Sequence, residues 1–151
     1  MSSATYPWPG IARRYASFLS VTAETPVVTL LEGNTPLIPV PNFVAAIGGR
    51  FDLFLKYEAL NPTCSFKDRG MTVMVSYLKS RGLDHVLEDS SGNAGASLSA
   101  YAAAASMRCR ILVPETASYP KIAQIAACGA DVVTIRGTRQ DVADAAMRMS
   151  D

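Results

Sequence analysis

The sequence predicts an α/β fold in which a parallel sheet carries helices on both faces, a three-layer αβα arrangement preceded by an irregular N-terminal arm. From residue 51 onward, short apolar runs alternate with helical stretches, a pattern typical of parallel strands joined by crossover helices. The runs at 111–113 and 132–135 are mostly β-branched, as expected of strands buried on both faces. Residues 1–50 hold six of the nine prolines and show little periodicity, which predicts an arm.

The elements follow one another in a regular order. Within the arm we expect only a short strand near 27–30 and a small helix at 43–47. After the arm, the pattern predicts strands at 51–57, 85–89, 109–113 and 131–135, and helices at 66–81, 94–106, 119–128 and 139–149. Met71, Val75 and Leu78 form part of the apolar stripe of the first long helix.

Composition excludes several classes of protein. The 151 residues are 49% hydrophobic with a net charge of +1, which fits one globular domain and gives no electrostatic footprint for nucleic acid or an acidic membrane. No apolar run reaches the ~18 residues of a membrane span. Three cysteines without metal-ligand spacing indicate reduced thiols, so we expect a cytoplasmic protein without a metal site.

One lysine stands out by its position. Residues 61–70 read Asn-Pro-Thr-Cys-Ser-Phe-Lys-Asp-Arg-Gly, and a capping box formed by Ser65 and Asp68 would place Lys67 in the first helical turn. The helix macrodipole disfavours an ammonium there by about 0.3–1 kcal/mol. A neutral lysine amine is the form that makes Schiff bases, so Lys67 is a candidate catalytic residue. The alternative is a solvated lysine paired with Asp68.

A second segment suits an anionic ligand. Residues 86–97 read Val-Leu-Glu-Asp-Ser-Ser-Gly-Asn-Ala-Gly-Ala-Ser, an apolar strand end followed by a small-residue turn and an alanine-rich helix. Unpaired N–H groups at such a helix start can bind a carboxylate or phosphate, and Gly92 and Gly95 allow close approach of a ligand. The alternative is an ordinary strand-to-helix turn with a serine cap.

These two segments resemble the signature segments of pyridoxal-phosphate enzymes of the tryptophan synthase β type (fold type II), and most closely those of the threonine synthases. The same resemblance extends over roughly residues 6–147. It includes Glu32-Gly33-Asn34-Thr35-Pro36-Leu37, the stretch 8–19 with Arg14-Tyr15, and Lys121 with Gln124 before Gly129-Ala130.

The resemblance implies roles for individual residues. Lys67 corresponds to the lysine that forms the Schiff base with the cofactor pyridoxal 5'-phosphate and then moves protons. Asn93 corresponds to the asparagine that hydrogen-bonds the ring hydroxyl oxygen of the cofactor. The resemblance implies that the substrate's carboxylate is bound by the loop of Ser91, Gly92, Asn93 and Ala94. It also implies that Ser65 and Arg69 either lie near the distal end of the substrate or support the lysine.

Cys64 departs from the family pattern, which commonly has glycine just before the serine. If that position needs a positive φ, a cysteine there would be strained. The alternative is a substitution that the turn tolerates.

Length is the larger departure, because proteins of this family run to more than twice this chain. Their glycine-rich cofactor-phosphate loop lies in the second half, and no comparable glycine cluster follows Gly95 here. We therefore expect a fragment or truncated form in which residues 1–50 belong with a larger domain and residues 51–151 form the smaller, lysine-bearing domain. A homodimer or a separate C-terminal half would be its macromolecular partner.

The resemblance implies a lyase that converts O-phospho-L-homoserine to L-threonine and phosphate, and that is inactive without the second half. Its small-molecule partner would be a phosphorylated hydroxy amino acid. Two alternatives stay open: a related pyridoxal-phosphate ammonia-lyase acting on amino acids, and a non-catalytic, truncated module that binds an amino acid or has a regulatory role.

Overall fold

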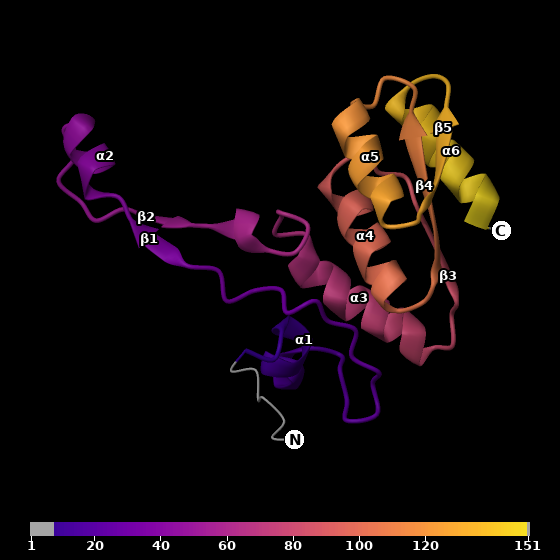
Figure 1. Ribbon diagram of the computed structural model, residues 1–151, viewed down its shortest axis with the longest axis horizontal. Helices are drawn as coiled ribbons and strands as arrows, with labels where there is room; N and C mark the ends of the chain where they lie inside the picture. Colours follow the sequence, from indigo (N-terminus) through magenta and orange to yellow (C-terminus); the bar gives the residue numbers. More distant parts are fainter. Residues whose placement is uncertain (1–7, 151) are drawn as a thin grey trace.

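The computed structural model describes residues 8–150 and contains a three-stranded parallel sheet. Its strands β3 (His85–Glu88), β4 (Arg108–Pro114) and β5 (Asp131–Ile135) pair in the order β3-β4-β5. The crossover helices α4 (Asn93–Ala104) and α5 (Tyr119–Ala127) cover one face, and α6 (Arg139–Ser150) covers the other (Figure 1). The predicted three-layer α/β class is confirmed.

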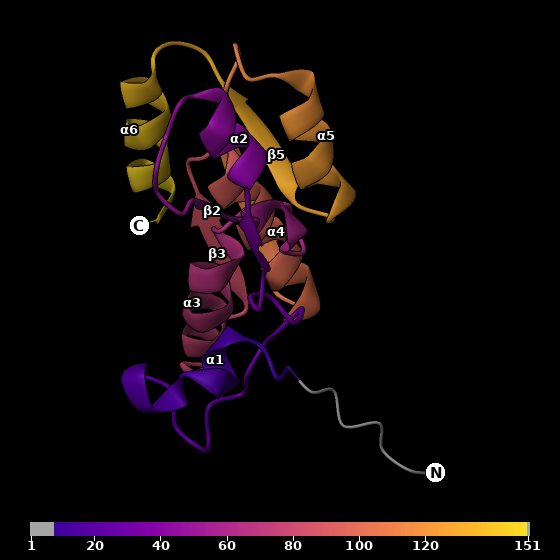
Figure 2. The same cartoon turned by 90° about the vertical axis from the view of Figure 1, so that its left-hand side faces the viewer.

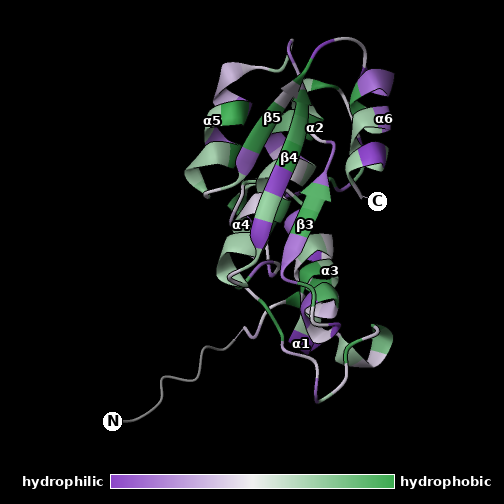
Figure 3. Ribbon diagram, turned by 90° about the vertical axis from the view of Figure 1, so that its right-hand side faces the viewer, coloured by the Kyte–Doolittle hydropathy of each residue, from purple (hydrophilic) through white to green (hydrophobic). Residues whose placement is uncertain are grey.

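Side-chain alternation along β4 separates the two cores. Ile111 and Val113 are buried in the cluster that contains α4 and α5 residues, whereas Leu112 is buried with Val142 and Ala145 of α6. A central parallel strand with both faces covered is apolar throughout, which explains the continuous run at 111–113. In Figure 3 the sheet lies between α5 and α6, and the central strand β4 is hydrophobic toward its carboxyl end.

Helix α3 (Asp68–Ser80) precedes the sheet and packs on α4 through Met71 and Val75. Because α3 ends five residues before β3 begins, its start lies toward the carboxyl end of β3. This connection positions Lys67. Within residues 8–150, no helix is both long enough and apolar enough to span a membrane.

The arm contains α1 (Ile11–Arg14), the 3₁₀ turn η1 (Ala16–Phe18), β1 (Leu37–Pro39) and α2 (Pro41–Ala46). Strand β2 (Phe54–Lys56) pairs with β1 antiparallel, and this pair projects away from the three layers with α2 at its tip (Figure 1). Figure 2 views this projection end-on, with α2 in front of the layers. The 3₁₀ turn η2 (Glu58–Leu60) leads back toward α3. The predicted helix at 43–47 is confirmed within one or two residues as α2.

Two sequence predictions about strands are wrong. Residues 51–57 do not contribute a strand to the parallel sheet, because only 54–56 are extended and they pair with β1 in a separate sheet. No strand forms at 27–30, because the Val28 N–H donates to Ser76 Oγ (2.9 Å) and the Val28 carbonyl accepts from Thr72 Oγ1 (2.7 Å). Hydroxyls of α3 thus take the place of a neighbouring strand.

A buried carboxylate fixes the first part of the arm. Glu32 is fully buried, and its oxygens accept hydrogen bonds from the Ile11 N–H (2.9 Å), the Leu30 N–H (3.1 Å), the Thr29 hydroxyl (3.0 Å) and the Tyr101 hydroxyl (2.8 Å). Buried charge is tolerated only where it is fully hydrogen-bonded. Since Tyr101 belongs to α4, this carboxylate joins the arm to the helical layer.

Candidate active site

Lys67 lies immediately before the first residue of α3, and its side chain is exposed. The predicted capping box is wrong, because the helix begins at Asp68 and the Ser65 hydroxyl accepts the Lys67 N–H (3.1 Å), two residues on. Ser65 itself is buried. A serine turn of this kind fixes the backbone of the lysine without engaging its amine.

Asp68 is not the partner of Lys67. It is fully buried, and its carboxylate accepts the Thr63 N–H (2.7 Å), the Thr63 hydroxyl (2.5 Å) and the Ser97 hydroxyl (2.5 Å). Within residues 8–150, no carboxylate forms an ion pair with Lys67, whose Nζ lies 5.3 Å from the centre of the Phe66 ring. Lys67 Nζ therefore has no carboxylate partner among the described residues, and Asp68 fixes the 63–67 turn against α4.

Cys64 adopts a φ of +60° in this turn. This left-handed conformation favours glycine. The positive φ that would strain a cysteine is therefore present. The cysteine is exposed, and its side chain contributes no core packing that would offset the strain.

The start of α4 is open to a ligand. Gly92 is its N-cap residue, no side chain caps the helix among the described residues, and its first turn holds no acidic residue. The alternative of a serine-capped turn is therefore not what forms. Since the first-turn N–H groups of a helix lack intrahelical acceptors, those of α4 are available to an anion.

The glycines of this loop have different surroundings. A Cβ at Gly95 would lie 2.2 Å from the Ser90 carbonyl oxygen, so the loop rests directly on α4 there. A Cβ at Gly92 would meet nothing within 4 Å. Ser91 and Ala94 are half-buried and Asn93 is exposed. In the predicted substrate-binding loop, Gly95 is therefore packed against the backbone, whereas the space next to Gly92 is open.

Glu88, the last residue of β3, is a polar group that the sequence interpretation missed. Its Oε2 is buried without a hydrogen-bond partner among the described residues. Burial, together with the negative charge of Asp89, raises the pKa of Glu88, and the charges of Lys67 and Arg139 oppose that shift. The sequence near Glu88 shows no residue with which it would pair. The only signal for its role is its position directly before the 89–92 loop.

Arg69 faces the arm. Its guanidinium donates to both Glu58 oxygens (2.7 and 2.8 Å) and to Thr35 Oγ1 (3.0 Å). This bidentate pair lowers the pKa of Glu58 to about 2. Asn61 donates to the same carboxylate (3.0 Å) and accepts the Gly33 N–H (2.9 Å). Arg69 therefore braces the start of α3 against residues 33–35.

Hydrogen bonds between helices bring the two predicted segments together. Asp68 bonds to Ser97 of α4, and Gln124 of α5 donates to the Thr63 carbonyl (3.2 Å). Lys67 lies toward the carboxyl end of β3 because α3 runs antiparallel to that strand. It does not follow a strand of the parallel sheet, since residues 54–56 pair with β1 instead.

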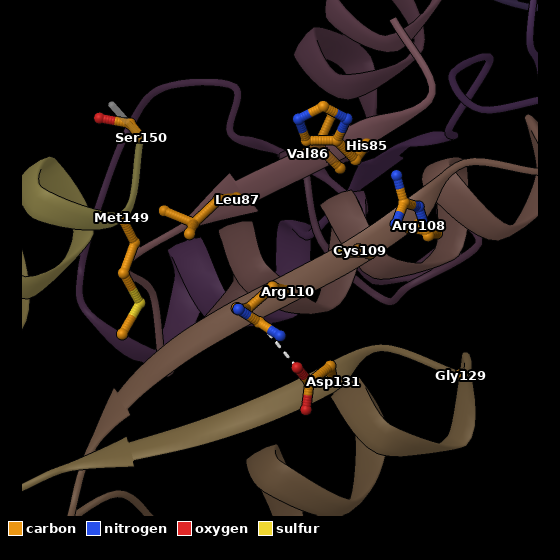
Figure 4. Close-up of a pocket in the computed structure, with 10 residues that line it drawn as sticks. All are labelled: His85, Val86, Leu87, Arg108, Cys109, Arg110, Gly129, Asp131, Met149 and Ser150. Atoms are coloured by element: carbon orange, nitrogen blue, oxygen red, sulfur yellow. Dashed lines mark hydrogen bonds and ion pairs between the residues drawn. The ribbon is translucent and has the colours of Figure 1, made fainter.

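A separate hollow lies at the opposite ends of the strands. His85, Arg108 and Asp131, the first residues of the three strands, contribute to its lining, and Asp131 bonds Arg110 (2.7 Å) within it (Figure 4). None of the predicted site residues lines it. Ligands of open α/β sheets bind beyond the carboxyl ends of the strands, so this hollow is not the candidate active site.

Comparisons with known proteins agree with the geometry. Residues 28–151 match the family described as "Pyridoxal-phosphate dependent enzyme". The chain is 41% identical to threonine synthase from Synechocystis sp. over 99% of its length and 44% identical to threonine synthase from Bacillus sp. (strain ULM1) over 89%. It covers 39% and 38% of those proteins, so it spans about two fifths of the curated relatives.

Solved structures show the same fold. Threonine deaminase isoform 2 from Solanum lycopersicum superposes with a TM-score of 0.69 at 27% identity, covering 77% of this chain and 32% of that one. Serine racemase from Dictyostelium discoideum gives 0.67 at 28% identity, covering 78% and 38%. With a family match over most of its length and pyridoxal phosphate as the cofactor of its relatives, the chain belongs to the pyridoxal-phosphate-dependent enzyme family.

Proposed function

We propose that this chain is the lysine-bearing part of a threonine synthase-like lyase, which converts O-phospho-L-homoserine to L-threonine and phosphate. The observation that carries the proposal is the exposed Lys67, which has no carboxylate partner within residues 8–150 and is held beside an α4 start that no described side chain caps. Identities of 41–44% with threonine synthases support this substrate over the substrates of other pyridoxal-phosphate enzymes.

The residues present fit pyridoxal 5'-phosphate. Lys67 supplies a free amine for a Schiff base, and the uncapped α4 turn supplies N–H donors for an anionic group. When bound, the cofactor supplies the electron sink for carbanion chemistry. The buried Oε2 of Glu88, which has no hydrogen-bond partner within residues 8–150, is available to a polar group of the ligand or to the lysine.

The chain's own residues then have separate tasks. Lys67 binds the cofactor and holds or moves a proton at its Nζ atom. Asn93 donates to the ring hydroxyl oxygen, and the loop formed by Ser91, Gly92, Asn93 and Ala94 binds the substrate's carboxylate. Ser65 supports the lysine through the Lys67 N–H. For Arg69 we propose a place at the distal end of the substrate or, as its bonds to Glu58 favour, a brace for α3.

We further propose that residues 1–50 belong with a larger domain and residues 51–151 form the smaller domain of a complete enzyme. Apolar side chains of the projecting segment are exposed, as packing against another domain would require. Within residues 1–50 they include Leu37, Phe43 and Ile47. We expect turnover only when a C-terminal half, in the same or a separate chain, completes the site.

A related ammonia-lyase is the second candidate, supported by the structural likeness to threonine deaminase at 27% identity. A non-catalytic, amino-acid-binding module is the third. Release of phosphate from O-phospho-L-homoserine by the completed protein would favour the first, and release of ammonia from L-threonine the second. Ligand binding without either reaction would favour the third.

The deciding experiment is an absorbance titration of the purified chain with pyridoxal phosphate. We expect a visible Schiff-base band in the wild type and in Lys79→Ala, a control lysine that bonds the Ala105 carbonyl at the far end of α4. The band should be absent in Lys67→Ala. A band that survives in Lys67→Ala, or one lost equally in Lys79→Ala, would refute the assignment of Lys67.

A further inference from the structure

Lys121 lies in an unfavourable place for a lysine. It is the third residue of α5, and its Nζ donates to Asn93 Oδ1, an atom of the first residue of α4, at 2.6 Å. Both helix starts carry partial positive charge, and neither first turn holds an acidic residue. No ion pair to Lys121 occurs within residues 8–150. Helix stability therefore does not account for this contact.

The chemistry of lysine determines the orientation of Asn93. An ammonium has three donors and no acceptor, so the atom of Asn93 that it contacts must be the carbonyl oxygen. The amide nitrogen of Asn93 then points away from Lys121, and its two N–H donors have no acceptor among the described residues. Without the lysine, either end of the amide could face the site.

Lys121 is itself held in place. Gln124, one turn further along α5, lies with Oε1 3.4 Å from Lys121 Nζ, and its Nε2 donates to the Thr63 carbonyl at 3.2 Å. Thr63 in turn donates to Asp68, the residue after Lys67. A continuous series of polar contacts thus runs from Asn93 through α5 to the turn that carries Lys67.

We propose that Lys121 is a positioning residue that fixes the side-chain amide of Asn93 with its NH₂ group directed away from α5, as a donor to the ligand. The proposal rests on the proposed function in one respect, which is that the acceptor for this donor is the ring hydroxyl oxygen of pyridoxal phosphate. Gln124 and Thr63 set the position of the ammonium. Loss of the lysine frees the amide to rotate.

The first test uses the ¹⁵N-labelled chain without cofactor. The side-chain amide signals of Asn93, assigned by their absence in Asn93→Asp, should shift in Lys121→Met and return toward the wild-type position in Lys121→Arg, which keeps donors at this site. Lys79→Met is the matched control, because Lys79 bonds the carbonyl at the opposite end of α4. It should leave the Asn93 signals unchanged.

The second test adds pyridoxal phosphate. We expect Lys121→Met to weaken cofactor binding about five- to tenfold, the effect of one mispositioned hydrogen bond, with Lys121→Arg close to the wild type. Unshifted Asn93 signals in cofactor-free Lys121→Met would overturn the proposal, whatever the cofactor does. If the cofactor-free signals shift but pyridoxal phosphate perturbs nothing in the wild type, the orientation by Lys121 stands and the proposed function of this chain fails.

Discussion

Replacing Gly95 by alanine should destabilise the chain, although the same replacement in most helices stabilises it. Gly95 and Gly70 are each the third residue of a helix, α4 and α3 respectively. Alanine at such positions favours the helix by about 0.5–1 kcal/mol through propensity and chain entropy. At Gly70 the new Cβ meets nothing within 4 Å, so Gly70→Ala should raise the free energy of unfolding by that amount.

At Gly95 the new Cβ would lie 2.2 Å from the Ser90 carbonyl oxygen and 3.2 Å from Ile111 Cγ2. The nearest atom belongs to the backbone, so the whole 89–92 loop must move to relieve the contact. Overpacking of this kind costs about 1–3 kcal/mol. Because the helix contribution is common to both substitutions, the free energies of unfolding of Gly95→Ala and Gly70→Ala should differ by that overpacking cost.

Urea unfolding followed by circular dichroism measures the difference directly, provided that the slopes of the two variants agree. Equal free energies for the two variants would refute the argument that the loop rests on α4 at Gly95. A Gly95→Ala variant more stable than the wild type would do so still more strongly.

Three further substitutions test other parts of the structure by the same urea assay. Cys64→Gly should stabilise the chain by about 0.5–1 kcal/mol, because relief of a left-handed φ (about 1–2 kcal/mol) exceeds the added chain entropy, whereas Cys64→Ala should change little. The pKa of Glu58 falls to about 2 in the folded state, so the native chain binds fewer protons than the unfolded one and stability declines as pH drops from 5 toward 2. Glu58→Gln should flatten that decline by about 1 kcal/mol, since the pair is partly screened, and an unchanged slope would contradict it. Tyr101→Phe removes one donor from the buried Glu32 carboxylate and should cost about 1.5–3 kcal/mol, against almost nothing for the exposed Tyr77→Phe.

The α/β part of the fold could be predicted because its information is local. Apolar runs at 109–113 and 131–135 and the helical stripe of α3 are visible within single windows of sequence. The arm could not be predicted in this way. Residues 54–56 look like a strand and form one, but nothing in the window shows that they pair antiparallel with 37–39. Val28 bonds to hydroxyls 44 and 48 residues away.

The candidate site divides along the same line. Lys67 and the 90–95 loop were identified from adjacent residues, whereas the contacts that assemble them span long separations. Asp68 meets Ser97 at a separation of 29 residues, and Lys121 meets Asn93 at 28. Adjacent residues therefore indicate a local cap for Asp68 and no role for Lys121.

Among the described residues, buried polar side chains outside the site have hydrogen-bond partners, whereas the site holds a buried carboxylate oxygen that has none. The fully buried Glu32 has four donors, and Arg69 and Glu58 form a bidentate pair. Beyond the carboxyl end of β3, by contrast, α4 starts without a cap, Lys121 extends toward two positive helix ends, and Glu88 keeps an oxygen unpartnered among the described residues. Violations of local preference concentrate where function requires them. The N–H groups at the start of α4 would gain an acceptor from an anionic ligand group, and Glu88 would gain a donor from a hydrogen-bonding one. Their clustering supports a cofactor site at the start of α4.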